Sequence, residues 1–116
     1  MRNMPSSPGQ VLPGTLEVLI LRALGTDERH GLGIARRIEA MTRDTFQVKA
    51  GSLFPALHRM ERAGWLTSFW DVAENGRRAR FYQLTALGRR QLESETAKWR
   101  RVLDGLAAAL RTPSRG

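Results

Sequence analysis

The sequence predicts a small, mostly α-helical domain with a β-hairpin wing and a long C-terminal helix. Three observations predict it. Apolar residues recur at helical spacing in three segments before Gly64, an Asn-Gly pair separates two strand-like segments, and a heptad pattern runs through the C-terminal part. With 116 residues and no cysteine, the chain has room for one domain and has no disulfide or thiolate zinc site.

The chain is strongly basic. It contains 19 Lys and Arg residues against 11 Asp and Glu residues, which gives a formal net charge of +8. Residues 1–48 hold six basic and five acidic groups, residues 49–80 hold six and three, and residues 81–116 hold seven and three. This excess favours a polyanionic partner, of which nucleic acid is the commonest, over simple solvation of the surface.

The N-terminal segment predicts the cellular location. Residues 1–11 are rich in Pro, Ser and Gly and are expected to form a flexible tail. They lack the apolar core of a signal peptide, and no apolar run in the chain approaches the roughly 20 residues of a membrane span. We therefore expect a cytoplasmic protein that does not enter the membrane.

Two amphipathic helices are predicted in the first half of the chain. Thr15 is a suitable N-cap for the first and Gly25 a suitable end, and its apolar face is formed by Leu16, Leu19, Ile20, Ala23 and Leu24. Further apolar residues on other sides of this helix suit burial between two subunits. Residues 26–29 are predicted to form a turn, and the second helix is expected from about Gly31 to Met41, with Arg36 on its solvated side.

A third helix follows, with Leu53, Leu57 and Met60 at helical spacing. Proline is tolerated in the first turn of a helix, where its missing N–H needs no partner. Pro55 therefore predicts an N-cap between Ala50 and Ser52, and Gly64 is expected to end the helix.

A β-hairpin is predicted next, because Trp65–Val72 and Arg80–Thr85 are rich in aromatic and β-branched residues. Asn75-Gly76 between them is typical of a tight hairpin turn, since both residues tolerate positive φ. The hairpin cannot bury a sheet alone and must pack on the helices. The expected architecture is a winged helix-turn-helix over residues 12–85, a dimerisation helix over 86–111 and a frayed tail over 112–116.

The third helix and the hairpin tip carry the candidate DNA-binding residues. In a helix-turn-helix the N-terminal part of the recognition helix meets base edges, and its free N–H groups favour an anionic phosphate. Three arginines at one hairpin tip repel each other unless an anion meets them. The alternative is that these charges merely solvate the surface. The expected DNA-binding set is Lys49, Gly51, Ser52, Phe54, His58, Arg59, Arg77, Arg78 and Arg80.

The last helix predicts a homodimer. Leu92, Trp99 and Leu106 repeat every seven residues, as do Thr96, Leu103 and Leu110, and this stripe is too long for the other elements to cover. A two-fold partner would place two recognition helices about one DNA turn apart on an inverted repeat. The expected dimer contacts are Leu16, Leu19, Leu92, Trp99, Leu103, Leu106 and Leu110. Trp99 serves either as interface core or as a stacking surface for a small aromatic inducer.

Signals for an enzyme are poor. His30 and His58 are the only histidines, and without cysteine they form no recognisable metal site. The sequence contains no Ser-His-Asp arrangement, dinucleotide fingerprint or phosphate-binding Gly-Lys-Ser/Thr loop. His30 is expected to cap or pack the second helix. We therefore expect no catalysis, no metal and no cofactor.

Several segments together resemble the PadR family of bacterial regulators. They are Pro13-Gly14-Thr15-Leu16, His30-Gly31-Leu32-Gly33-Ile34, Gly51-Ser52-Leu53-Phe54-Pro55-Ala56-Leu57-His58-Arg59-Met60-Glu61, Gly64-Trp65-Leu66, and Arg77-Arg78-Ala79-Arg80-Phe81-Tyr82-Gln83-Leu84-Thr85. The resemblance spans about residues 12–105. It implies the short form of the family, a winged-helix homodimer that represses transcription from a palindromic operator and dimerises through its last and first helices.

Two positions depart from the family pattern. The family often has tyrosine where this chain has Leu32 and Phe54, so the hydroxyl groups are absent here. The nearest alternatives to a dimeric repressor are a winged-helix effector sensor of the MarR-like type and a winged helix used for protein contact.

Overall fold

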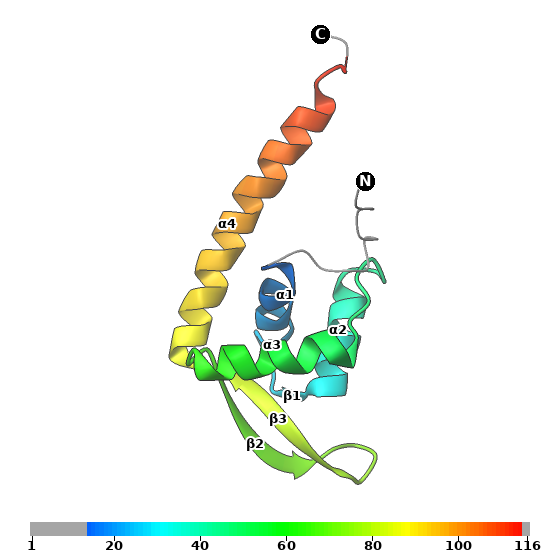
Figure 1. Cartoon of the computed structure of the whole chain (residues 1–116), viewed down its shortest axis with the longest axis vertical. Helices are drawn as coiled ribbons and strands as arrows, with labels where there is room; N and C mark the ends of the chain where they lie inside the picture. Colours follow the sequence, from blue (N-terminus) through cyan, green and yellow to red (C-terminus); the bar gives the residue numbers. More distant parts are fainter. Residues whose placement is uncertain (1–13, 115–116) are drawn as a thin grey trace.

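The computed structural model describes residues 14–114 and contains four helices and three strands (Figure 1). Their order is the predicted one, with one short strand added, and the predicted fold class is confirmed. The expected tail at residues 1–11 and the end of the expected tail at 112–116 lie outside the described residues. The elements are α1 (Thr15–Ala23), β1 (Arg29–His30), α2 (Gly31–Met41), α3 (Ala50–Arg62), β2 (Leu66–Val72), β3 (Arg78–Leu84) and α4 (Ala86–Arg111).

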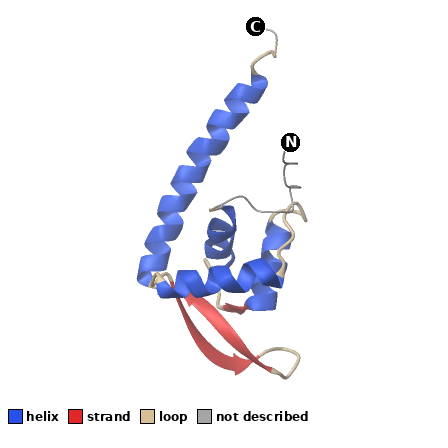
Figure 2. Cartoon of the chain, viewed as in Figure 1, coloured by secondary structure: helices blue, strands red, loops and turns tan. Residues whose placement is uncertain are grey.

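The three strands form one antiparallel sheet in the order β1-β3-β2, at one end of the helices (Figure 2). The prediction of a turn through Arg29 was wrong, because Arg29 pairs with Tyr82 and His30 pairs with Phe81. A strand of two residues is too short to show an alternating pattern, so its pairing becomes evident only in the folded chain. This strand joins the start of α2 to the hairpin.

The hairpin turn differs in detail from the expected tight turn. The Ala73 N–H donates to the Arg77 carbonyl at 2.8 Å, and the Gly76 N–H donates to the Ala73 carbonyl at 2.9 Å. Gly76 has a φ of 83°, whereas Asn75 is not among the residues with positive φ. The connection is therefore a three-residue loop that ends in a left-handed glycine, the next most common hairpin geometry.

Two helices begin earlier than predicted, α1 by one residue and α3 by one to three residues. Gly14 takes the N-cap position of α1 in place of Thr15, with a φ of 85°. Lys49 is the N-cap of α3, so Pro55 lies in the second turn of the helix. Proline there cannot donate to the Gly51 carbonyl. Both residues are exposed on the surface of the helix.

The core lies between α1, α2, α3 and the sheet. Its fully buried side chains include Ile20, Ile34, Leu57 and Tyr82. Leu16, an expected dimer contact, is 5% exposed and belongs to this core within a single chain. Its burial arises because α1 packs against α2, α3 and α4 of its own chain, which the sequence pattern alone does not reveal.

Helix α4 has two parts with different surroundings. Its first turns pack on α1 and β3, and the Thr85 hydroxyl accepts a hydrogen bond from the Gly88 N–H as the N-cap. From residue 100 to residue 111 every residue is exposed. This second part extends away from the other elements (Figure 1). Within residues 14–114, no helix is both long and apolar enough to cross a membrane.

Candidate nucleic-acid interface

The outer face of α3 presents several of the predicted residues together. Gly51, Phe54 and His58 are exposed and recur at intervals of three and four, so they share one side of the helix. Lys49 is exposed at the N-cap position, and Ser52 is exposed in the first turn. The N-terminal half of α3 therefore offers a basic side chain, a hydroxyl and an aromatic ring to a partner.

Arg59 lies on a different side of α3. Its guanidinium donates to the Glu17 carboxylate of α1 at 3.1 Å, so its charge is paired inside the chain. The sequence could not predict this contact, because the two residues are 42 positions apart. The structure thus separates Arg59 from the side of α3 that carries Gly51, Phe54 and His58.

The wing arginines differ in how they are held. The Arg80 Nε donates to the Ser68 hydroxyl at 2.9 Å, and its NH2 group lies 3.7 Å from the Glu61 carboxylate. The Arg78 guanidinium lies 5.0 Å from the centre of the exposed Trp70 ring. Within residues 14–114, neither Arg77 nor Arg78 has a carboxylate partner. Their charges are therefore available to an external anion.

A groove of about 390 Å³ opens between the hairpin loop and the N-terminal ends of α2 and α3. Arg36, Arg77, Arg78 and Arg80 line it, and Glu74 is the one carboxylate among its lining residues. Leu32 and Phe54 form part of the same wall. The groove therefore combines concentrated positive charge with apolar side chains at the end of the recognition helix.

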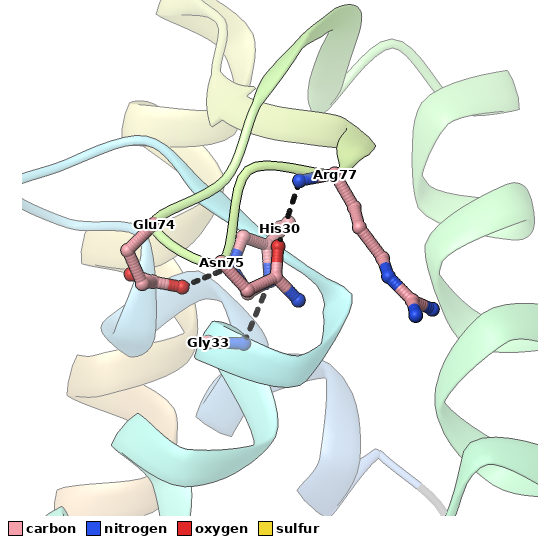
Figure 3. A network of polar contacts seen from close by, with 5 residues as sticks. All are labelled: His30, Gly33, Glu74, Asn75 and Arg77. Carbon is pink, nitrogen blue, oxygen red and sulfur yellow. Dashed lines mark hydrogen bonds and ion pairs between the residues drawn. The ribbon is translucent and has the colours of Figure 1, made fainter.

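His30 links the hairpin loop to α2 (Figure 3). Its Nδ1 accepts a hydrogen bond from the Gly33 N–H at 3.1 Å, which confirms the expected capping role. Its Nε2 lies 3.1 Å from the Glu74 carboxylate. Because Nδ1 accepts, Nε2 carries the proton and donates it. This hydrogen bond, reinforced by a backbone hydrogen bond and by the charge of Arg36, lowers the pKa of Glu74 below its usual value of 4.5.

The loop is also organised from within. The Asn75 side-chain oxygen accepts a hydrogen bond from the Arg77 N–H at 3.0 Å, and the Arg77 side chain extends away from this cluster (Figure 3). The His30 ring additionally packs edge-on against Phe81, with ring centres 5.2 Å apart. These contacts connect the loop that carries Arg77 to the start of α2.

The residues expected at a dimer interface fall into two groups. Leu19 and Leu92 are partly buried against the core of their own chain. Leu103, Leu106 and Leu110 are 59%, 56% and 84% exposed on the second part of α4. Trp99 lies between the groups, half-buried, with its ring edge 3.8 Å from where a Cβ on Gly14 would lie. Its indole N–H has no acceptor within the described part of the chain.

Comparison with known proteins identifies the family. The family model of the transcriptional regulator PadR-like family matches residues 20–94, more than half of the chain. The chain belongs to the PadR-like family of transcriptional regulators. It is 35% identical over 88 residues to the transcriptional regulator Rv3488 of Mycobacterium tuberculosis, covering 76% of this chain and 75% of that protein.

Solved structures of PadR-like regulators have the same fold. A PadR family transcription regulator from Clostridium difficile shares 28% identity with a TM-score of 0.71, and the match covers 84% of this chain and 99% of the other. A PadR-like regulator from Bacillus cereus shares 26% identity with a TM-score of 0.74, covering 86% and 95%. The resemblance stated from the sequence is thus confirmed. So is the expectation of a non-enzymatic DNA-binding protein, because PadR-like regulators are of that class.

Eight of the residues that line this groove were not among the predicted site residues, and Leu32, Arg36 and Glu74 are three of them. Arg36 was expected only on the solvated side of its helix, and Leu32 and Glu74 were assigned no site. Leu32 and Arg36 are four positions apart and therefore share a side of α2. That spacing is the signal that could have grouped them, but the approach of the hairpin loop depends on β1, which the sequence pattern did not reveal.

Proposed function

We propose that this regulator is a homodimeric repressor that binds an inverted-repeat operator, in the cytoplasm, through α3 and the wing. The observation that carries the proposal is the exposed apolar stripe on the second part of α4. The stripe consists of Val102, Leu103, Leu106 and Leu110, all more than 40% exposed.

A second copy of the chain is the occupant that this stripe fits. At 100° per residue, Leu103, Leu106 and Leu110 lie within about 60° of each other around the helix, which is the width of a coiled-coil seam. Such an apolar seam on an otherwise solvated helix usually packs against a partner, because exposing apolar area to water is unfavourable. A copy of the same helix offers the same seam, so a two-fold contact buries both.

The proposed DNA contacts combine base readout with phosphate binding. Lys49, Gly51, Ser52, Phe54 and His58 would face the major groove from α3, while Arg77 and Arg78 would neutralise backbone phosphates. Arg59 and Arg80 remain in the proposed set, but their charges are already paired with carboxylates. We assign them the weaker contributions. A dimer bound in this way across a promoter would exclude the transcription machinery, which is the basis for proposing repression.

The test is the double variant Leu103→Glu, Leu106→Glu. Two carboxylates in a coiled-coil seam repel their copies across the two-fold axis, so the variant is expected to be monomeric by light scattering. Its affinity for an inverted-repeat operator is expected to fall by at least about tenfold, since each half-site must then bind alone.

The matched control is Ala97→Glu, Ala108→Glu. It adds the same charge to the same helix but on the opposite side, about 150° to 170° from the centre of the seam, and is expected to remain dimeric with unchanged affinity. If the seam variant is still a dimer, the second part of α4 is not the dimer contact. A wild-type chain that is monomeric and pairs only with another protein would favour the protein-interaction module instead.

A small aromatic inducer at Trp99 is the second candidate activity. The observation that favours it is the half-buried indole whose N–H lacks an acceptor within residues 14–114. Planar aromatic compounds are expected to quench the fluorescence of the wild-type protein. Trp65 and Trp70 also emit, so the comparison is with Trp99→Phe, and an identical response in that variant would remove Trp99 from the site.

A further inference from the structure

The groove lined by Arg36, Arg77, Arg78 and Arg80 is called the arginine groove below. A second, smaller hollow lies beside it, between the N-terminal ends of α2 and α3. Its volume is about 170 Å³, and every residue that lines it is apolar or glycine. Leu32 and Ala35 come from α2, Val48 precedes α3, and Ala50 and Phe54 belong to α3. An entirely apolar hollow at the N-terminal end of a recognition helix is not explained by phosphate binding.

The wall of this apolar hollow is held in place. The Phe54 ring lies directly against Gly31, so that a Cβ on Gly31 would be 2.7 Å from the Phe54 Cζ. The absence of a side chain at Gly31 therefore lets the tip of the ring approach the start of α2 closely. Leu32 and Phe54 are nevertheless 53% and 41% exposed. They present a fixed apolar surface outward.

The apolar hollow and the arginine groove share three residues, Gly31, Leu32 and Phe54. Arg36, Arg77 and Arg78 stand on the other side of that shared wall. An apolar group carried by a polyanion fits both surfaces at once. In the major groove of DNA, the apolar group exposed on a base edge is the C5-methyl of thymine.

We infer that the apolar hollow receives thymine methyl groups, so that Leu32 and Phe54 help to select thymine in each operator half-site. The inference rests on the proposed function and adds a base preference to it. Removing one methyl from the contact is expected to weaken binding about fourfold, the factor that corresponds to one buried carbon group.

The test begins by selecting binding sites for the full-length protein from random double-stranded DNA. Each thymine of the resulting half-site is then replaced by deoxyuridine, which removes the methyl and leaves base pairing unchanged. At least one position is expected to show about fourfold weaker binding with the wild-type protein. For Leu32→Ala and Phe54→Ala, the ratio between the thymine and deoxyuridine probes is expected to approach one at that position.

Leu87→Ala is the matched control for Leu32→Ala. Leu87 is 41% exposed in the first turn of α4 and lines neither the groove nor the apolar hollow, so its variant should keep the wild-type ratio. A half-site that tolerates deoxyuridine at every thymine would overturn the inference and leave the proposed function standing. A selection that returns no preferred sequence would overturn both. Retention of the wild-type ratio in both Leu32→Ala and Phe54→Ala would also refute the assignment.

Discussion

Gly88 shows at the scale of one residue how the long helix is joined to the rest of the molecule. A Cβ on Gly88 would overlap with the carbonyl oxygen of Trp65 and lie 3.0 Å from its carbonyl carbon. At the same junction the Thr85 hydroxyl donates to the Gly64 carbonyl at 2.6 Å, and the Thr85 N–H donates to the Trp65 carbonyl at 3.0 Å. The angle of α4 is therefore set by backbone contacts.

Gly88→Ala is expected to lower the free energy of unfolding by about 3 kcal/mol, because backbone atoms must move to make room for the methyl group. Chemical denaturation measures the change. Gly105→Ala is the control in the same helix. No atom lies within 4 Å of its Cβ position, so this variant should gain about 1 kcal/mol from helix propensity. Equal stabilities for the two variants would contradict the close contact at Trp65.

The contact between His30 and Glu74 predicts a pH dependence at the hairpin loop. The pKa of Glu74 is lowered in the folded state, so the stabilisation is complete above the usual value of 4.5 and disappears as the pH falls through the lowered pKa. In His30→Asn the new side chain can still cap α2 but lacks the ring nitrogen that donates to Glu74. The pKa of Glu74 should therefore rise toward 4.5, as an NMR titration of its carboxyl group would measure. An unchanged pKa would mean that His30 is not its cause.

Some residue roles could be predicted and others could not. The capping role of His30 follows from its place directly before an amphipathic helix, and the structure confirms it. The partners of Arg59 and Arg80 are Glu17 and Glu61, which are distant in sequence. Charge composition shows that a segment is basic, but the fold decides which of its charges are neutralised internally.

At the scale of elements, the wing is the part whose charge is most available. Arg77→Ala combined with Arg78→Ala is expected to weaken binding to all DNA sequences alike. The slope of log affinity against log salt should become shallower by about two, because two phosphate contacts are lost. Binding isotherms at several salt concentrations measure both quantities.

A control for the wing variant removes the same charge elsewhere. Arg90→Ala combined with Arg101→Ala takes two exposed arginines from the side of α4 opposite the apolar stripe. It is expected to leave the salt slope unchanged. If both double variants make the slope of log affinity against log salt shallower by the same amount, the effect reflects net charge. The wing then has no specific part in phosphate binding.

The elements that the sequence predicted best are those with a long periodic pattern. The bounds of α2 and α4 agree with the prediction because each has several turns of apolar spacing and a capping residue. The sequence did not predict β1, because a strand of two residues is too short to show an alternating pattern of apolar and polar side chains. The predicted start of α3 was too late, because proline is most often found in the first turn of a helix. Pro55 lies in the second turn of α3.

At the scale of the whole molecule, the sequence predicted the composition of the surface better than its arrangement. The heptad pattern correctly marked Leu103, Leu106 and Leu110 as apolar residues without cover in their own chain. It did not show that Leu16 is covered internally. The arginine groove could not be foreseen either, since it forms where α2, α3 and the hairpin loop meet and each contributes a few residues.

Sequence-specific DNA binding by a dimer is tested by a titration that counts the chains in the complex. The purified protein is titrated onto the DNA upstream of its own gene, at two salt concentrations, with random DNA as competitor. We predict a complex of two chains per site that survives the competitor and weakens steeply as salt rises. A complex lost equally to any DNA, or one that contains a single chain, would contradict the claim.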